Sequence, residues 1–317
     1  MLLSISETAK LITNAQKIAL TGHINPDPDT LGCVLALGSA LKKMNKEIVM
    51  IIDDDIPDSL SFMPRADEIL RPDKFKNIKF DLLIVLDASD VERIGQVATL
   101  RAPILNIDHH ISNTHFADYL LLDTQAAATG EIVYRLLSEL GTEIDLSMAV
   151  NLYTAIATDC GFFKYANTKP QTMYCAAKLL DIGVKPNEIS DRLEATSKEN
   201  IILLTEVLKT MEFFSENKIA VISLPQELVR ANTDTEGFIQ YPRCIDGVEV
   251  AVFCKYVAEN ITRISMRSKN TDVSKVALSF GGGGHQRAAG CTVYEAVETA
   301  KQQIITALNS ALAADPL

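Results

Sequence analysis

The chain has 317 residues, of which 47% are hydrophobic, and its formal net charge at pH 7 is −11. Length and hydrophobic content are typical of a globular protein that can hold two domains, which excludes a disordered chain. The negative charge disfavours tight, non-specific binding to long nucleic acids, because such binding depends on many lysine and arginine contacts with phosphates.

The cysteines and the N-terminal segment indicate a reducing compartment. The six cysteines show no C-x-x-C spacing, and most lie in apolar runs, so we expect reduced thiols and neither a disulfide framework nor a structural zinc site. Residues 1–7 lack a basic region followed by a long apolar stretch, and no segment approaches the roughly 18 apolar residues that cross a bilayer. We therefore expect a soluble, cytoplasmic protein without a membrane partner.

Apolar strand patterns alternate with helical patterns over the first part of the chain. We predict strands at residues 18–20, 47–52, 80–86 and 103–107, and helices at residues 30–43, 127–140 and 146–158. Alternation of this kind predicts an α/β fold with a doubly wound, mostly parallel sheet. We assign residues 1–185 to this domain.

The remainder of the chain has a different pattern. Residues 186–213 mix charged residues with isoleucine and leucine and are predicted to form a helical connector. Strand-like runs follow at residues 218–224, 248–257 and 261–268, and the last predicted helix covers residues 295–312. This pattern predicts a second, smaller domain of mixed α/β structure at residues 214–317.

Acidic and histidine residues follow several of the predicted strands and helices. They are His23, Asp27, Asp29, Asp87, Asp108, His109, His110 and Asp159. Because side chains just past the carboxyl ends of parallel strands converge on one crevice, these residues can meet although they are far apart in the sequence. The sequence therefore predicts a shared site at that edge of the sheet.

The charge of this group predicts a metal site. If they lie close together, Asp27, Asp29, Asp87 and Asp159 raise one another's pKa and cannot all stay ionised, and divalent cations remove that conflict. Carboxylate oxygens with one or two imidazoles suit Mn²⁺ or Mg²⁺. The aspartate at the predicted end of a helix, Asp159, opposes the helix dipole, which also suggests a cation nearby.

Structural roles are the alternative for several of these residues. Asp27 and Asp29 could be turn or N-cap residues of the helix predicted from residue 30, and Asp87 could cap a helix near Val91. The companion motifs favour the metal role over these alternatives. The small residues Thr129 and Gly130 are interpreted as packing residues, and the acidic run at residues 53–55 as solvated loop charge.

A glycine-rich segment in the second predicted domain suggests a binding site for an anion. Residues 281–284 are all glycine, and His285 and Arg287 follow them. Exposed N–H groups of Gly282, Gly283 and Gly284 would let an anion approach closely, while the two cationic side chains would donate to phosphate. Arg267, at the end of a predicted strand, is a plausible second cation. A flexible glycine turn is the alternative, which His285 and Arg287 disfavour.

Taken together, the motifs resemble those of the DHH phosphoesterase superfamily. The matching segments are His23-x-Asn25-Pro26-Asp27-x-Asp29, Asp87-Ala88-Ser89-Asp90, Asp108-His109-His110, Ala157-Thr158-Asp159-x-Gly161 and Gly281 to His285. More narrowly, the chain is similar to the nanoRNase and pAp phosphatase group, in which a DHHA1 domain follows the catalytic domain. Cys33 departs from the serine that commonly follows the glycine of the first motif.

The resemblance implies a role for each residue. Two Mn²⁺ ions would be bound, with Mg²⁺ as the alternative: His23 and Asp27 would hold one ion, Asp29, His109 and Asp159 the other, and Asp87 would bridge both. His110 would face the substrate phosphate and Asp108 would orient a histidine. Water activated between two such ions would attack phosphorus without a covalent protein nucleophile.

The implied activity is hydrolysis of very short RNA, of dinucleotides such as pApA or pGpG, or of the 3′-phosphate of pAp. An inorganic pyrophosphatase built on the same first domain and a nucleotide-binding regulator without turnover are the alternatives. The sequence leaves open which short substrate dominates, the direction of digestion, the metal used in the cell, and whether the protein is a homodimer.

Overall fold

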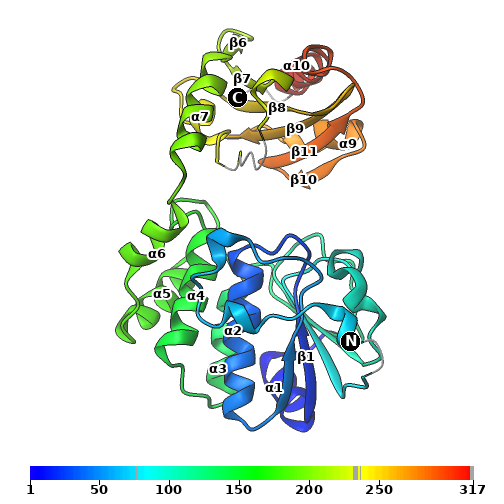
Figure 1. Ribbon diagram of the computed structural model, residues 1–317, viewed down its shortest axis with the longest axis vertical. Helices are drawn as coiled ribbons and strands as arrows, with labels where there is room; N and C mark the ends of the chain where they lie inside the picture. The colour runs from blue at the N-terminus through cyan, green and yellow to red at the C-terminus, as the bar shows by residue number, and fades with distance from the viewer. Residues whose placement is uncertain (76–77, 231–234, 236, 315–317) are drawn as a thin grey trace. The chain divides into compact units, whose positions relative to one another are not determined.

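The computed structural model describes residues 1–75, 78–230, 235 and 237–314. The chain divides into two compact units, Met1–Ala195 and Thr196–Leu317 (Figure 1). The last three residues of the second predicted domain, 315–317, lie outside the described ranges. Within those ranges, no helix combines the length and the apolarity that a membrane-spanning segment requires.

Unit 1 is an α/β unit. Its strands and helices are α1 (Ile5–Asn14), β1 (Lys17–Thr21), α2 (Pro28–Lys43), β2 (Glu47–Met50), β3 (Leu82–Leu86), β4 (Ile104–Asp108), β5 (Tyr119–Leu122), α3 (Thr129–Glu139), α4 (Leu146–Asp159), α5 (Pro170–Asp181) and α6 (Pro186–Leu193). Among the described residues, five strands form one sheet in the order β2-β1-β3-β4-β5, and every neighbouring pair is parallel. The predicted α/β fold with a parallel sheet is confirmed.

Both faces of this sheet are buried. Consecutive residues of β3, such as Ile84 and Val85, enter two different apolar clusters on opposite faces of the sheet. Helices α2, α3 and α4 cover the first face and lie side by side (Figure 1), whereas short 3₁₀ turns between residues 72 and 99 cover the second. A strand buried on both faces needs a continuous apolar run, and Leu82–Leu86 supplies one.

Glycines allow the helices of unit 1 to approach closely. A Cβ atom at Gly32 on α2 would lie 2.5 Å from the backbone oxygen of Asn151 on α4. A Cβ at Gly130 on α3 would lie 3.0 Å from the Cβ of Ala155, also on α4. The first turns of α2 and α3 are thereby held against α4.

Unit 2 has its own sheet and core. Its strands and helices are α7 (Lys198–Lys209), β6 (Glu212–Phe214), β7 (Ile219–Leu224), α8 (Gln240–Arg243), β8 (Val250–Ala258), β9 (Ile261–Ser268), α9 (Val273–Ser279), β10 (Gly283–His285), β11 (Ala288–Val293) and α10 (Val297–Ala314). The described part of the unit forms a mixed six-stranded sheet in the order β10-β11-β9-β8-β7-β6. One face packs on α9 and α10, and the other on α7.

Several elements differ from the sequence predictions. The range 186–213 contains two helices, of which α6 falls in unit 1 and α7 in unit 2. Helix α1 was not predicted, although Ser4 and Glu7 form a capping box that marks its start.

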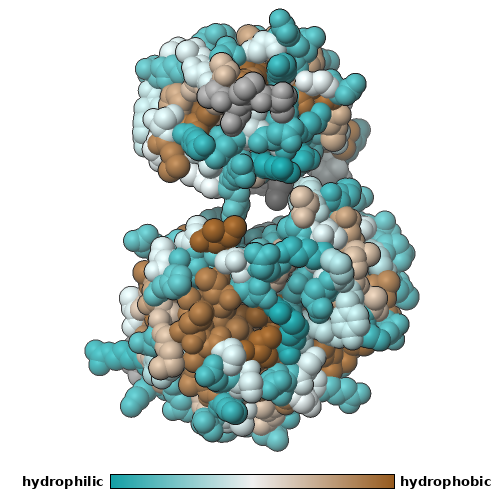
Figure 2. Space-filling view, turned by 180° about the vertical axis from the view of Figure 1, so that it is seen from behind, coloured by the Kyte–Doolittle hydropathy of each residue, from teal (hydrophilic) through white to brown (hydrophobic). Residues whose placement is uncertain are grey.

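On the face shown in Figure 2, apolar side chains gather in one area of unit 1, while polar side chains cover much of the rest.

Candidate metal centre

The loops that follow β1, β3 and β4 place the central residues of the site. His23 lies two residues after β1, Asp87 directly follows β3, and His109 and His110 directly follow β4. Strand β1 pairs with β2 on one side and with β3 on the other. The strand order therefore reverses its direction across the sheet between β1 and β3. Ligands of open α/β sheets bind at this switch point, beyond the carboxyl ends of the strands.

Two helices place the remaining carboxylates. Asp27 is the N-cap of α2, and its Oδ1 accepts a hydrogen bond of 2.9 Å from the N–H of Thr30. The capping role considered for Asp27 from sequence is therefore real, but its other oxygen, Oδ2, lies 3.4 Å from Nε2 of His23. Asp29 lies in the first turn of α2, and Asp159 is the last residue of α4.

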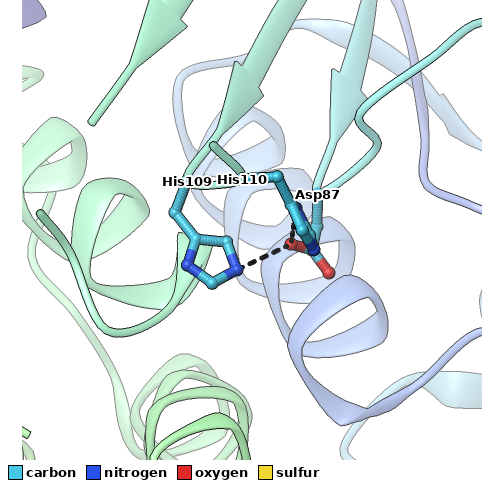
Figure 3. Close-up of side chains that lie close together, drawn as sticks. All are labelled: Asp87, His109 and His110. Atoms are coloured by element: carbon cyan, nitrogen blue, oxygen red, sulfur yellow. Dashed lines mark ion pairs between the residues drawn. The ribbon is translucent and has the colours of Figure 1, made fainter. Parts of the chain in front are cut away.

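Asp87 is at the centre of the cluster. Its Oδ2 lies 3.7 Å from Nε2 of His23, and its Oδ1 lies 3.6 Å from Nε2 of His109 (Figure 3). Nδ1 of His110 is 3.7 Å from the same Oδ1. Asp87 has a φ of +59°, in the left-handed region that aspartate tolerates better than most residues, and this backbone conformation turns its carboxylate into the site.

Three groups of ligand atoms are close enough to hold a cation. They are His23, Asp27 and Asp87; Asp87, His109 and His110; and Asp29, His109 and Asp159, with the atoms of each group within 4.8 Å of one another. The structure thus brings together every metal ligand named from the sequence. The group of Asp87, His109 and His110 links the other two, because it shares Asp87 with the first group and His109 with the third.

Asp29 is fixed by the start of helix α3. Its Oδ2 accepts a hydrogen bond of 2.7 Å from the N–H of Thr129, and its Oδ1 accepts one of 2.9 Å from the N–H of Gly130. The thiol of Cys33 donates to Oδ1 at 3.4 Å. A carboxylate is favourable here because the first N–H groups of a helix have no partner within the helix and carry partial positive charge.

Asp108 is fully buried and holds His110. Its Oδ1 accepts hydrogen bonds from Nδ1 of His110 at 2.7 Å and from the N–H of His109 at 2.8 Å. Nδ2 of Asn113 donates to its Oδ2 at 2.6 Å and to Oδ1 of Asn106 at 2.8 Å. The imidazole of His110 is therefore held through Nδ1.

Crowding of charge shifts the pKa values of the cluster. Burial raises the pKa of Asp29 well above its ordinary value, and the charges of Asp87 and Asp159 raise it further. Burial and the charge of Asp27 raise the pKa of Asp87, and burial with the charge of Asp87 raises that of Asp159 to about 6. Burial lowers the pKa of His110, but the hydrogen bond to Asp108 and the nearby carboxylates outweigh it and raise this pKa to about 9.

The donor set fits divalent cations. Carboxylates with raised pKa values face one another without a lysine or arginine among the ion-pair partners that the structure shows for them. Oxygen donors with a few imidazoles match hard ions such as Mn²⁺ and Mg²⁺, and a cation would lower the free energy of the ionised carboxylates. The site therefore has the chemistry of a divalent metal centre.

Removal of metal is expected to make stability dependent on pH. Between 3.8 and about 6, Asp159 binds more protons in the folded than in the unfolded state, so stability falls as pH rises through this window. The stabilisation from His110 is complete below 6.5 and is lost as pH rises through about 9. The gain in Tm when Mn²⁺ is added to chelator-treated protein should therefore be larger at about pH 7.5 than at about pH 5. An equal gain at both values, measured by differential scanning calorimetry, would contradict this.

In unit 2, the residues named for phosphate binding lie in and beside a hairpin. His285 on β10 pairs with Ala288 on β11, which pairs in turn with Arg267 on β9, so His285 and Arg267 occupy the same face of the sheet. Arg287 is exposed in the turn between β10 and β11. Its backbone oxygen accepts a hydrogen bond of 3.1 Å from the N–H of Ser268, which anchors the turn to the end of β9.

The glycine segment is more ordered than predicted. The N–H groups of Gly281 and Gly282 donate to Leu278 and Ala277 at the end of α9, so the prediction that the N–H group of Gly282 is exposed is wrong. Gly283 and Gly284 belong to strand β10. A Cβ at Gly282 would lie 2.2 Å from the oxygen of Gly290, and one at Gly284 would lie 2.5 Å from that of Ala288. Glycine is needed there for close packing of the hairpin.

Sequence reasoning missed several residues that support the site. Asn113 donates to Asp108 and to Asn106, which places the Asn113 amide. Asp54, interpreted as solvated charge, accepts a hydrogen bond of 2.9 Å from the N–H of Asn25 in the His23 loop. Thr129 and Gly130, interpreted as packing residues, also bind Asp29. Asn106 could have been found from the sequence, because a polar residue inside an apolar strand needs a buried hydrogen-bond partner.

The parallel sheet and the cluster of carboxylates and imidazoles at its carboxyl edge define an α/β protein built to bind divalent cations. Residues 17–158 match the model of the DHH family, N-terminal domain, and residues 217–314 match that of the DHHA1 domain. The chain belongs to the DHH family, in the branch that carries a C-terminal DHHA1 domain.

Relatives of similar length support this assignment. The chain is 33% identical to the bifunctional oligoribonuclease and PAP phosphatase NrnA of Thermus thermophilus over 91% of this chain and 87% of the relative. It is 27% identical to the protein of the same name from Bacillus subtilis, over 91% and 93%. The crystal structure of an exopolyphosphatase-related protein from Bacteroides fragilis superposes with a TM-score of 0.90 at 27% identity, covering 96% of this chain and 95% of that one.

Proposed function

We propose that this protein is a divalent-metal-dependent phosphohydrolase that degrades very short RNA and dinucleotides to mononucleotides, removes the 3′-phosphate of pAp, or does both. The observation that carries the proposal is the arrangement of ligand groups on both sides of Asp87, which suits two cations and one phosphate. The NrnA relatives, named as oligoribonuclease and PAP phosphatase, support the substrate class.

In this proposal Mn²⁺ is the preferred ion, and Mg²⁺ is the alternative. His23 and Asp27 would hold one ion, Asp29, His109 and Asp159 the other, and Asp87 both. Two such cations, when bound, supply positive charge beside the reacting phosphate and lower the pKa of water. The side chains of the protein would contact the phosphate, donate protons and bind the rest of the substrate.

His110 would act on the substrate phosphate. Its hydrogen bond to Asp108 fixes the ring and, in the metal-free protein, raises the pKa of His110 to about 9. Nε2 can then donate to a phosphoryl oxygen or to the leaving oxygen. Since Asp108 accepts the Nδ1 proton, it acts through His110 and is a positioning residue.

Residues of unit 2 would bind the part of the substrate beyond the scissile phosphate. Arg267, His285 and Arg287 supply hydrogen-bond donors around the β10–β11 hairpin, and Gly282, Gly283 and Gly284 keep its backbone free of side chains. The proposed substrates also agree with a cytoplasmic location.

The experiment that tests the proposal is a panel assay. Purified protein is stripped with a chelator, Mn²⁺ or Mg²⁺ is restored, and pAp, pApA, pGpG, RNA of two to ten nucleotides, cyclic dinucleotides and pyrophosphate are compared. Turnover of the linear short nucleotides supports the proposal. Turnover of pyrophosphate alone would favour the pyrophosphatase alternative, which the DHHA1 match at residues 217–314 disfavours. Absence of turnover with either ion would favour the regulator.

Replacement of Arg287 by alanine is expected to weaken substrate capture. Loss of a charge-assisted contact with phosphate should raise KM about tenfold or more. The value of kcat should change by less than about threefold, because a contact that is equally strong in the ground state and the transition state affects only substrate binding. Arg263→Ala is the matched control, since Arg263 is an exposed arginine on strand β9 of the same unit. An unchanged KM for pApA in the Arg287 variant would remove this residue from the binding site.

A further inference from the structure

Each carboxylate oxygen of Asp87 accepts a hydrogen bond from a different threonine. The hydroxyl of Thr30 donates to Oδ2 at 2.9 Å, and the hydroxyl of Thr129 donates to Oδ1 at 2.9 Å. Both threonines are fully buried. They come from the first turns of two different helices, α2 and α3.

The same two threonines also bind the outer aspartates of the cluster. The backbone N–H of Thr30 donates to Asp27 at 2.9 Å, and that of Thr129 donates to Asp29 at 2.7 Å. Each threonine therefore connects Asp87 with one outer carboxylate, Thr30 on the side of His23 and Thr129 on the side where Asp29 and His109 lie. The two halves of the cluster are supported in the same way, by residues far apart in the sequence.

Packing fixes the orientation of the Thr30 hydroxyl. A Cβ atom at Gly22 would lie 2.1 Å from the Cγ2 methyl of Thr30, so this methyl occupies the space that the glycine leaves open at the end of β1. With the methyl held there, Oγ1 is directed at Asp87. Staggered rotamers of a β-branched side chain leave few alternatives.

The hydroxyls determine what the oxygens of Asp87 can still bind. A carboxylate oxygen offers about two acceptor positions, and one position of each oxygen is taken by a threonine. The second acceptor position of each oxygen is left for another partner. Oδ2 lies 3.7 Å from Nε2 of His23, and Oδ1 lies 3.6 Å from Nε2 of His109. Each oxygen of Asp87 could then bind one cation.

We propose that Thr30 and Thr129 are positioning residues that each orient one oxygen of Asp87, Thr30 for a cation on the His23 side and Thr129 for a cation on the His109 side. This inference rests on the proposed two-cation function. Loss of either hydroxyl should therefore weaken one of two ion sites and spare the other.

The test measures Mn²⁺ binding without substrate, by isothermal titration calorimetry and by electron paramagnetic resonance of free Mn²⁺. Thr30→Val and Thr129→Val keep the shape of the side chain and remove the hydroxyl, whereas Thr30→Ser and Thr129→Ser keep the hydroxyl. In each valine variant one of two dissociation constants should rise about 10- to 100-fold, as for other residues that orient metal ligands. The serine variants should bind Mn²⁺ more tightly than the valine variants because they keep the hydroxyl, and Thr30→Ser, which loses the methyl that restricts the rotamer, should lie between its valine variant and the wild type.

Combination with His23→Asn identifies the site. Thr30→Val should add little to His23→Asn, since both act on the same ion, whereas Thr129→Val should add its full effect. Valine variants that bind two Mn²⁺ ions with wild-type constants would overturn the inference, as would serine variants as weak as the valine variants. Wild-type protein that binds two ions but turns over nothing in the panel would overturn the proposed function and leave the roles of the threonines standing.

Discussion

Replacement of Asp87 by asparagine is expected to abolish hydrolysis of every substrate in the panel. Asp87 belongs to the ligand groups on both sides of the cluster, so its neutralisation affects both. A loss of about 4 kcal/mol of transition-state stabilisation corresponds to about a 1,000-fold lower rate. Asparagine keeps the side-chain shape and also tolerates the left-handed backbone at this position, where φ is +59°. Initial rates with saturating Mn²⁺ measure the effect.

Stability separates this effect from misfolding. Removal of one buried charge from a crowded acidic cluster should leave the metal-free variant at least as heat-stable as the metal-free wild type, because the pKa of Asp87 is raised in the folded protein. Asp55→Asn is the control, since the Asp55 side chain is 97% exposed. If the Asp87 variant kept more than about a tenth of the wild-type rate, a shared ligand role for Asp87 would be wrong.

Replacement of Asp108 by asparagine should lower kcat about 100-fold, as loss of a residue that orients a catalytic imidazole does. Asparagine has a single acceptor oxygen, whereas Asp108 accepts from Nδ1 of His110, from two backbone N–H groups and from Asn113. The pKa of His110, about 9 in the wild type, should fall because its partner loses its charge. Nuclear magnetic resonance titration of the imidazole in the metal-free protein measures this change.

A double-mutant cycle tests whether Asp108 acts through His110. If it does, the variant that combines Asp108→Asn with His110→Asn should be no slower than His110→Asn alone. Losses that multiply would show that Asp108 supports the site independently, for example through its hydrogen bond to Asn113.

The sequence predicts the parallel sheet well because its strands are short apolar runs separated by helical patterns, and β3 is the clearest example. The side chains named for the metal site come together in the structure, since the carboxyl ends of the strands define where they meet. Their assignment as ligands of particular ions stays a prediction. Strands β5 and β10 were not predicted, and β10 consists of two glycines and a histidine, which show no strand pattern.

The supporting contacts could not be predicted from the sequence, because they join residues that only the fold brings together. Thr129 binds Asp87 and Asp29 across intervals of 42 and 100 residues. Asn113 reaches Asp108 through a loop whose path no local pattern specifies. Gly282 was interpreted as part of an anion-binding segment because of its neighbours in the sequence. In the structure, glycine is required there because a Cβ atom would clash with the backbone oxygen of Gly290.

The parallel topology of unit 1 has a consequence during synthesis of the protein. Parallel neighbours are joined by long crossovers, and the cluster draws on segments from the end of β1 to the end of α4. A chain still emerging from the ribosome therefore lacks part of the cluster until α4 has left the exit tunnel. Since unit 2 is translated afterwards, the acidic cluster can assemble and capture cations before the cationic hairpin of unit 2 exists.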